Sequence, residues 1–299
     1  MSLSSEPSRL AVIGDPIAHS LSPLLQNTMI KHFDLPFVYQ AMAVAAERLA
    51  EVIDQLRRDE LHGINITIPH KQTIMPLLDD LAAPADQIGA VNTVVNSQGK
   101  LVGYNTDAVG FTKSLWAAGL SAAHEHVLVL GAGGAAAAVV FALLAEGAAA
   151  ISLCNRSAER TQLLMQRIPA MYQDKLRVIA WQNREDWLRI KPASMIVNTT
   201  SVGMHPNVED SPLPESVFEA ETVVIDLVYN PVETALLRFA RQAGATTLHG
   251  LPMLIFQGVA ALELWSGENL DIRDIYTDLE RALISELNTK RQSQLSNLS

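Results

Sequence analysis

The stretch 126–156, "HVLVLGAGGAAAAVVFALLAEGAAAISLCNR", decides the fold class. It begins with an apolar run typical of a buried strand, passes through a cluster of glycines, and continues into an alanine-rich segment that favours a helix. A second apolar run, residues 151–154, closes the unit. Strand, turn, helix and strand in this order build parallel α/β sheets, and similar units follow up to about Gly250. We therefore expect an α/β protein that contains a Rossmann-type domain.

The glycine turn within this stretch predicts dinucleotide binding. Residues 131–136, "GAGGAA", match the pattern G-x-G-x-x-A between a strand and a helix. Glycine permits the tight turn and lets the backbone approach a pyrophosphate, and the free N–H groups of the following helix attract its charge. A purely structural turn is the alternative, and the strand–helix context makes it the weaker one.

The residues after the second strand indicate which cofactor is bound. An NAD site usually places a carboxylate there to accept hydrogen bonds from the ribose 2′-hydroxyl. This chain has Asn155, Arg156, Ser157 and Arg160 instead, and guanidinium groups can hold a 2′-phosphate. We therefore expect NADP, with NAD as second choice because Glu159 lies among these residues. The alternative is that Arg156 only caps a helix or points into solvent.

Composition excludes several classes of protein. The 299 residues are 48% hydrophobic and 18% charged, which suits one large or two medium globular domains. The formal net charge of −10 argues against nucleic-acid or membrane partners. Cys154 is the only cysteine, so an internal disulfide is impossible, and this fits a reducing compartment. No secretory signal is recognisable, and we expect a cytoplasmic protein whose polar last residues, 288–299, are frayed.

Polar residues gather at predicted strand ends in the first half of the chain. They are Ser20, Ser22, Asn65, Thr67, Lys71, Asn92, Asn105, Thr106 and Asp107. Taken singly, most would be turn or cap residues, and Ser22 and Asp107 are predicted N-caps of helices. Ser20 has no such local role. Together the hydroxyls, amides, ammonium and carboxylate suit a polyhydroxylated acid.

The segment 63–71, "GINITIPHK", contributes three of these residues. Its alternation predicts a strand with Ile64, Ile66 and Ile68 in the core and with Asn65 and Thr67 on the opposite face. The proline that follows is expected to end the strand, so that the lysine at position 71 turns back towards the polar face. Two further strands, 90–96 and 100–105, are predicted to form a hairpin through a turn at 97–99.

These motifs resemble one known family. The segments "GDPIAHSLSP", "GINITIPHK", "GAVNT", "GYNTDAVG", "GAGGAAAA", "NRS", "YNPVETALL" and "GLPMLIFQG" occur in the order seen in the shikimate dehydrogenase family, which includes the quinate/shikimate dehydrogenases. The resemblance extends from about Leu10 to about Gly267. It implies a substrate-binding domain formed by residues 1–106 and 251–299, and an NADP-binding Rossmann domain formed by residues 107–250.

The resemblance also implies roles for individual residues. Lys71 and Asp107 would be the catalytic pair, with Asp107 either sharing the proton or only orienting the lysine. The implied substrate-binding residues are Ser20 and Ser22 for a carboxylate, Asn65, Thr67, Asn92, Asp107 and Gln257 for ring hydroxyls, and Tyr229 lining the pocket. The implied cofactor-binding residues are Gly131, Ala132, Gly133, Gly134, Ala135, Asn155, Arg156, Ser157, Arg160, Thr199 and Gly250. No metal is expected.

Two departures from the family pattern bear on the substrate. Gln26 stands where the family often has histidine, and Pro252 stands where it usually has glycine. The expected reaction is oxidation of shikimate with NADP⁺. Broader use of quinate or NAD, a cofactor-binding regulatory protein without turnover, and another Rossmann enzyme such as a methylene-folate dehydrogenase are the alternatives. A monomer or a homodimer is equally compatible with the sequence.

Overall fold

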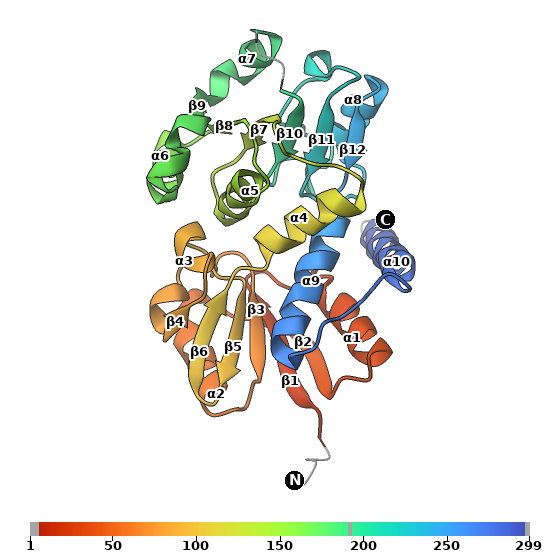
Figure 1. The fold of residues 1–299 in the computed structure, drawn as a ribbon. Coiled ribbons are helices and arrows are strands. Elements are labelled where there is room, and N and C mark those ends of the chain that lie inside the picture. The colour runs from red at the N-terminus through yellow and green to blue at the C-terminus, as the bar shows by residue number, and fades with distance from the viewer. Residues whose placement is uncertain (1–5, 191–192, 297–299) are drawn as a thin grey trace. The chain divides into compact units, whose positions relative to one another are not determined.

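Two six-stranded sheets, each in its own compact unit, organise the computed structural model (Figure 1). The structure describes residues 6–190 and 193–296. The first unit contains the chain up to Gly110 together with Leu254–Leu283, and the second contains Phe111–Met253 and the chain from Ile284 onward. Both units are α/β, as the alternation of strand and helix patterns predicts.

The first sheet is mixed, with the order β2-β1-β3-β5-β6-β4. Its strands are β1 (Ser8–Gly14), β2 (Phe37–Ala43), β3 (Gly63–Ile66), β4 (Asp80–Leu81), β5 (Thr93–Ser97) and β6 (Lys100–Tyr104). Strands β1, β2 and β3 are parallel, whereas β5 pairs antiparallel with both β3 and β6. The predicted β5–β6 hairpin is confirmed, and its turn places Gln98 and Gly99 at positive φ.

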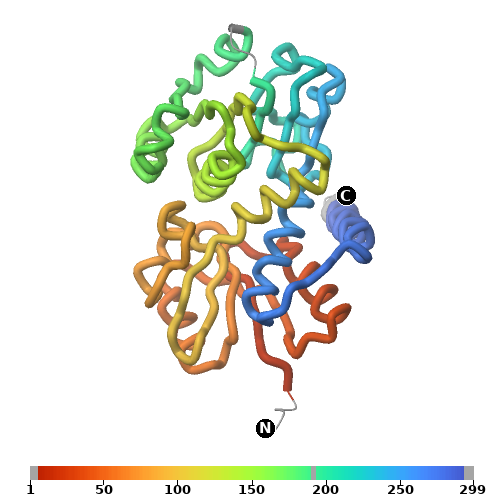
Figure 2. Tube along the Cα trace, in the orientation of Figure 1, coloured from red at the N-terminus to blue at the C-terminus, as the bar shows by residue number. Residues whose placement is uncertain are grey.

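Helices cover both faces of this sheet. They are α1 (Ser22–His32), α2 (Leu49–Arg57), α3 (Ala85–Ile88), the start of α4 (Asp107–Ala117), most of α9 (Leu251–Ser266) and the start of α10 (Tyr276–Ser296), with the 3₁₀ turns Ala46–Arg48 and Met75–Leu77. The apolar side of α2, including Val52 and Leu56, packs into one buried cluster with Ile64 and Ile66 of β3. Helix α9 lies beside the sheet (Figure 2), where the indole N–H of Trp265 donates to the Val94 carbonyl.

The second sheet is fully parallel, with the order β12-β11-β10-β7-β8-β9. Its strands are β7 (His126–Leu130), β8 (Ala150–Asn155), β9 (Leu176–Ala180), β10 (Met195–Asn198), β11 (Val223–Asp226) and β12 (Thr246–Leu248). The helices of this unit include α5 (Gly134–Ala145), α6 (Ala158–Arg167), α7 (Arg184–Ile190) and α8 (Ala235–Gln242), with 3₁₀ turns at Ala170–Lys175, Trp181–Asn183 and Glu215–Val217. The order departs from β7 in both directions, which is the doubly wound arrangement of a Rossmann domain.

Two sequence-based expectations are wrong. Strand β3 ends at Ile66, and Ile68 is 72% exposed rather than part of the core. The backbone N–H of Thr67 still donates to Ile13, but the chain then leaves the sheet, so the alternating pattern extends beyond the strand itself. The predicted fraying of residues 288–299 is also wrong as far as Ser296, because α10 continues to that residue. The last three residues lie outside the described part of the chain.

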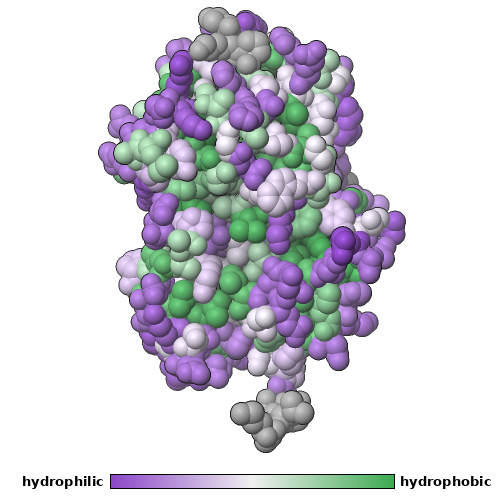
Figure 3. Space-filling view, in the orientation of Figure 1, coloured by the Kyte–Doolittle hydropathy of each residue, from purple (hydrophilic) through white to green (hydrophobic). Residues whose placement is uncertain are grey.

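On the face shown in Figure 3, hydrophilic side chains alternate with apolar ones, and the hydrophilic ones are most frequent towards the rim. Among the described residues, no helix is both long and apolar enough to cross a membrane.

Candidate active site

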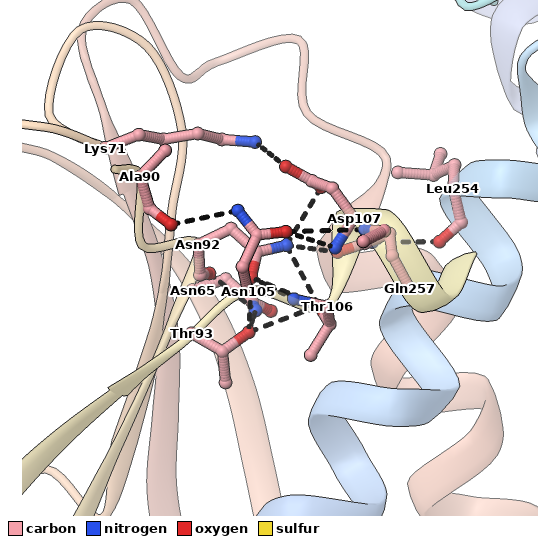
Figure 4. Close-up of polar contacts among 11 residues, drawn as sticks. Asn65, Lys71, Ala90, Asn92, Thr93, Asn105, Thr106, Asp107, Leu254 and Gln257 are labelled. Carbon is pink, nitrogen blue, oxygen red and sulfur yellow. Dashed lines mark hydrogen bonds and ion pairs between the residues drawn. The ribbon is translucent and has the colours of Figure 1, made fainter. Parts of the chain in front are cut away.

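A cluster of polar side chains in the first unit surrounds the start of α4 (Figure 4). Asn65 comes from the central strand β3, Asn92 directly precedes β5, and Asp107 is the first residue of α4. All three are almost fully buried, at 6%, 2% and 6% exposure. Polar groups withdrawn from water in this way require partners, and the cluster supplies them internally.

Lys71 and Asp107 form the charged pair of this cluster. The Lys71 Nζ lies 2.5 Å from Asp107 Oδ2, and the two side chains are 20% and 8% exposed. The second carboxylate oxygen, Oδ1, accepts a hydrogen bond of 2.9 Å from Asn92 Nδ2. A short, charge-assisted bond in a mostly buried setting holds the ammonium in one place while leaving it partly accessible.

Asp107 is free to make these contacts because Asn105 caps the helix. The Asn105 Oδ1 accepts from the backbone N–H groups of Asp107 and Ala108, at 3.1 and 3.3 Å, and its Nδ2 donates to the Ala90 carbonyl. The prediction that Asp107 is the N-cap is therefore wrong. An asparagine two residues earlier satisfies the free N–H groups, and the aspartate carboxylate turns to the lysine instead.

Asn92 connects the pair to the rest of the cluster. Its Nδ2 also lies 2.9 Å from Thr106 Oγ1 and 3.4 Å from Gln257 Oε1, and its Oδ1 accepts from the Thr106 backbone N–H at 2.7 Å. Asn65 joins through its Nδ2, which donates to the Asn92 carbonyl at 3.1 Å. Five predicted site residues, Asn65, Lys71, Asn92, Asp107 and Gln257, thus form one hydrogen-bonded network.

Gln257 reaches this network because α9 crosses α4 at a glycine. A Cβ on Gly110 would lie 2.7 Å from the Gln257 Cβ and 2.8 Å from its backbone nitrogen, so any side chain at position 110 would force the helices apart. The Gln257 Nε2 donates to Leu254 of its own helix at 2.8 Å. One Nε2 proton and lone pairs on Oε1 remain available to a ligand.

Ser20, Ser22 and Thr67 are half-buried and lie outside this network. Helix α1 begins at Ser22, with Leu21 as the N-cap residue, so the prediction that Ser22 is the N-cap is wrong by one position. The Ser20 Oγ accepts from the Ser22 backbone N–H at 3.2 Å, which gives Ser20 the local role that the sequence did not reveal. Its hydroxyl proton is still available to an anion at the helix start.

The glycine loop of the second unit joins β7 to α5 as predicted. Gly131 has a φ of +119°, and a Cβ there would lie 2.3 Å from Thr199 Oγ1, so this position requires glycine. Thr199 itself donates to the Leu130 carbonyl at 2.7 Å. At Gly133 a Cβ would meet no protein atom within 4 Å. The protein therefore does not need glycine at position 133 for its own packing, and the start of α5 is open beside it, where free helix N–H groups attract anions. Gly134 is the first residue of that helix, and the half-buried Ala132 and Ala135 flank the loop.

The residues after β8 also fit an NADP site. Ser157 is the N-cap of α6, because its side chain accepts from the Arg160 backbone N–H, so Arg156 does not serve as the cap. Asn155 donates to the Ser157 carbonyl and shapes the turn. Arg156 and Arg160 are exposed and form no ion pair with any described residue. Arg156 therefore does not cap the helix, but it does lie in solvent as the other half of that alternative holds, so a role in binding an anion stays a prediction.

Two family models match this chain. Residues 12–94 match the family model described as the shikimate dehydrogenase substrate binding domain, and residues 116–229 match that of shikimate / quinate 5-dehydrogenase. The chain belongs to the shikimate dehydrogenase family. This confirms the resemblance seen in the sequence motifs and removes the interpretation as another type of Rossmann enzyme.

Relatives of the family cover nearly the whole chain. Shikimate dehydrogenase (NADP(+)) of Bacillus cereus (strain AH187) is 39% identical over 262 residues, which are 87% of this chain and 93% of the relative. The structure of shikimate 5-dehydrogenase from Thermus thermophilus, in complex with NADP(H) and shikimate, is 37% identical, has a TM-score of 0.81, and covers 92% of this chain and 99% of its own. That from Listeria monocytogenes, in complex with shikimate and NAD, is 33% identical with a TM-score of 0.84, covering 91% and 96%. The likeness confirms the predicted fold class.

Three further predicted residues of this family member lie in the second unit. Tyr229 follows β11 in the same loop as Asn230, whose carbonyl accepts from the His205 N–H. Gly250 packs against that loop, because a Cβ there would lie 2.3 Å from the Leu227 carbonyl oxygen. Thr199 follows β10, next to the glycine loop. They mark the carboxyl ends of the strands, where ligands bind in Rossmann domains.

A buried carboxylate, missed by the sequence reasoning, holds these loops of the shikimate dehydrogenase fold together. Asp226 is fully buried and accepts hydrogen bonds from Asn198 Nδ2 (2.9 Å), the Val228 N–H (3.0 Å) and Thr234 Oγ1 (2.7 Å). Burial raises the pKa of Asp226 to about 6, although the three hydrogen bonds act in the opposite direction. Its position at the end of an apolar strand, "VVID", was the available signal.

Within the described ranges, no group of three or more His, Cys, Asp or Glu residues is arranged to hold a metal ion.

Proposed function

We propose that this protein is an NADP-dependent oxidoreductase that interconverts shikimate and 3-dehydroshikimate. Its membership of the shikimate dehydrogenase family supports this function, as do the NADP(+)-dependent relatives and the relative bound to shikimate and NADP(H). The observation that carries the proposal is the Lys71–Asp107 pair, partly accessible and surrounded by side-chain amides. A lysine with only a structural role would not require a partly accessible ammonium paired with a carboxylate at the edge of a buried polar network.

The first unit would recognise a ring that carries hydroxyls and a carboxylate. Ser20 and Ser22, at the start of α1, would donate to the carboxylate. The proposed partners of the ring hydroxyls are Asn65, Thr67, Lys71, Asn92, Asp107 and Gln257, whereas Tyr229 belongs to the second unit and its lining role stays a prediction. Short, directional hydrogen bonds of this kind select a polyol by the positions of its oxygens, because an analogue that lacks one leaves a buried partner unpaired.

The second unit would hold NADP. The glycine loop and the start of α5 would receive the pyrophosphate, and Asn155, Arg156, Ser157 and Arg160 would surround the adenosine ribose and its 2′-phosphate. Thr199 and Gly250 would border the remaining part of the cofactor. When bound, NADP⁺ supplies the acceptor for the hydride that leaves the carbinol carbon. These residues then need only position NADP and favour it over NAD.

Lys71 would handle the proton of the reacting hydroxyl. In the oxidation direction its Nζ, when neutral, accepts that proton, and in the reduction direction the ammonium returns it to the carbonyl oxygen. Asp107 fixes the lysine through Oδ2 and compensates its charge, so the ammonium formed during oxidation stays hydrogen-bonded. Direct transfer of the proton between Nζ and Oδ2 is compatible with the 2.5 Å contact.

Initial rates with shikimate and with quinate, each with NADP⁺ and NAD⁺, test the proposal. We expect kcat/KM to be highest for shikimate with NADP⁺. Formation of NADPH with none of the acids would contradict the function and favour a binding protein without turnover. A preference for quinate or for NAD⁺ would replace the substrate or the cofactor assignment while leaving the reaction class intact.

The setting of the reaction is part of the same proposal. We assign residues 1–106 and 251–299 to substrate binding and residues 107–250 to NADP binding. The single cysteine, Cys154, is buried in β8, and burial raises the pKa of its thiol to about 11, which keeps it unreactive in a reducing cytoplasm. Light scattering on the purified protein distinguishes a monomer from a homodimer.

A further inference from the structure

Behind the Lys71–Asp107 pair, two buried hydroxyls complete the polar network of the first unit. Tyr39, on β2, is 3% exposed, and Thr93, the first residue of β5, is fully buried. The Tyr39 hydroxyl lies 2.6 Å from Asn65 Oδ1. The Thr93 Oγ1 lies 3.0 Å from Asn65 Nδ2 and 3.1 Å from Asn92 Oδ1. The Thr93 Oγ1 also lies 3.3 Å from Thr106 Oγ1. Such buried groups can act on a substrate only through the side chains that they contact, and of these the two asparagines are predicted substrate-binding residues.

The backbone fixes which way each asparagine carboxamide faces. The Asn92 carbonyl can only accept, so the group that faces it must be the Asn65 Nδ2, at 3.1 Å. The Thr106 backbone N–H can only donate, so the group that faces it must be the Asn92 Oδ1, at 2.7 Å. Neither carboxamide can be flipped without setting two donors or two acceptors against each other.

These two orientations determine the direction of each bond that involves one of the two carboxamides, whereas the contact of 3.3 Å between the Thr93 and Thr106 hydroxyls can run either way. Tyr39 must donate its proton to Asn65 Oδ1, since that oxygen cannot donate. Thr93 must accept from Asn65 and donate to Asn92, which uses both functions of its hydroxyl. Asn92 then presents an N–H to Asp107 Oδ1. The other oxygen, Oδ2, faces Lys71.

We propose that Thr93 and Tyr39 are positioning residues that set the placement of Asn65 and Asn92 and thereby hold Asp107 with Oδ1 accepting from Asn92 and Oδ2 facing Lys71. Thr93 has the larger part, because it bonds to both carboxamides, whereas Tyr39 bonds to Asn65 alone. The inference rests on the proposed function, because it assigns these residues to the oxidation of shikimate. Its structural content, two locked carboxamides, does not depend on which substrate is used.

Thr93→Val and Thr93→Ser form a matched pair for the test. Valine preserves the shape of threonine but removes the hydroxyl, so one Asn65 proton loses its acceptor and Asn92 loses a donor. Serine keeps the hydroxyl and removes only a methyl group. We expect kcat/KM for shikimate to fall roughly 10- to 100-fold in Thr93→Val, because small displacements of positioning groups have effects of this size, and to stay within about threefold in Thr93→Ser.

The separate effects on kcat and on KM distinguish the role of the Thr93 hydroxyl from that of the Tyr39 hydroxyl. Thr93→Val is expected to lower kcat as well as raise KM, since it disturbs the amide that faces Asp107. Tyr39→Phe is expected to raise KM severalfold with little change in kcat, because Asn65 alone loses a partner. The affinity for NADPH, followed by its fluorescence, serves as the control and should stay unchanged in all three variants.

A second readout needs no turnover. In ¹⁵N NMR spectra, the side-chain amide protons of Asn65 and Asn92 should exchange slowly with water in the parent protein and in Thr93→Ser, and faster in Thr93→Val.

The inference is wrong if folded Thr93→Val keeps kcat/KM within twofold of the parent, or if serine is as damaging as valine. If Thr93→Val does not fold, Tyr39→Phe and Thr93→Ser decide by the same criteria. If the parent protein itself fails to oxidise shikimate, the proposed function falls, and the NMR comparison still decides whether the carboxamides are locked.

Discussion

Asp226→Asn is expected to make the protein more stable at neutral pH. The wild-type carboxylate is fully buried, with three hydrogen-bond donors around it and no cation among its described partners. Asparagine is isosteric, and its Oδ1 can keep the bonds from Asn198 and Val228. Its Nδ2 can donate to the Thr234 hydroxyl, which reverses the direction of that bond. The substitution therefore removes a buried charge but leaves the Thr234 hydroxyl proton and one Nδ2 proton without an acceptor, which offsets part of the gain.

The size of the effect follows from the raised pKa. Burial moves the pKa of Asp226 from 3.8 to about 6, and this difference corresponds to about 3 kcal/mol. The folded state binds the Asp226 proton more tightly than the unfolded state does. The contribution of this proton to the free energy of unfolding is therefore fully present below about pH 4 and is lost as the pH rises through 6. At pH 8 the carboxylate is ionised, and the full desolvation penalty of the buried charge lowers the free energy of unfolding. Asparagine avoids it, so the variant should be more stable by up to about 3 kcal/mol.

Urea unfolding followed by tryptophan fluorescence between pH 4.5 and 8 measures this difference. The gap between Asp226→Asn and the parent should widen as the pH rises to about 7 and then stay constant. Asp174→Asn, at an exposed carboxylate of the same unit, is the control and should show no such widening. If Asp226→Asn is less stable than the parent by the same amount at every pH, the charge itself contributes to stability, and the desolvation argument fails.

Three further predictions concern single side chains. Lys71→Ala should lower kcat by about 10² to 10⁴-fold with little change in shikimate binding, and a near-normal kcat would refute the role of the lysine in proton transfer. Arg156→Ala should weaken NADP⁺ binding about 10- to 100-fold in a titration while leaving NAD⁺ unaffected, because only the former carries the 2′-phosphate. Ile66→Ala should cost about 2 to 5 kcal/mol of unfolding free energy, whereas Ile68→Ala should change it by less than about 0.5 kcal/mol; equal effects in denaturant titrations would contradict the burial of the first and the 72% exposure of the second.

Features that depend on neighbouring residues were predictable from the sequence. The strand–glycine–helix–strand unit of the second domain and the hairpin turn at 97–99 are both present, because backbone preferences of glycine and apolar periodicity act over a few residues. The absence of a carboxylate at positions 155 and 156 pointed to NADP in the same way. These signals are local, and so are the structures that they specify.

Hydrogen-bond partners far apart in the chain were not predictable. Tyr39 and Asn65 are 26 residues apart, Lys71 and Asp107 are 36 apart, and Asn92 and Gln257 are 165 apart. The sequence marked several of these residues as polar at strand ends, but Tyr39 and Thr93 looked like ordinary strand residues. Only the sheet, which places β1 between β2 and β3, and β3 next to β5, brings their hydroxyls to the two carboxamides.

The helix caps also combine a local feature, which the sequence predicts, with a choice of partner, which only the tertiary structure decides. Serine and aspartate near a helix start predicted Ser22 and Asp107 as caps, and the elements indeed begin there. Which side chain does the capping is settled by competition for partners, since Asn105 is anchored to Ala90 while Lys71 binds the Asp107 carboxylate. By itself the sequence thus determined the fold class, the cofactor loop and the polar residue types of the site. The tertiary structure decided which of those residues are bound to one another, because a buried polar group takes the partner that folding brings within hydrogen-bond distance.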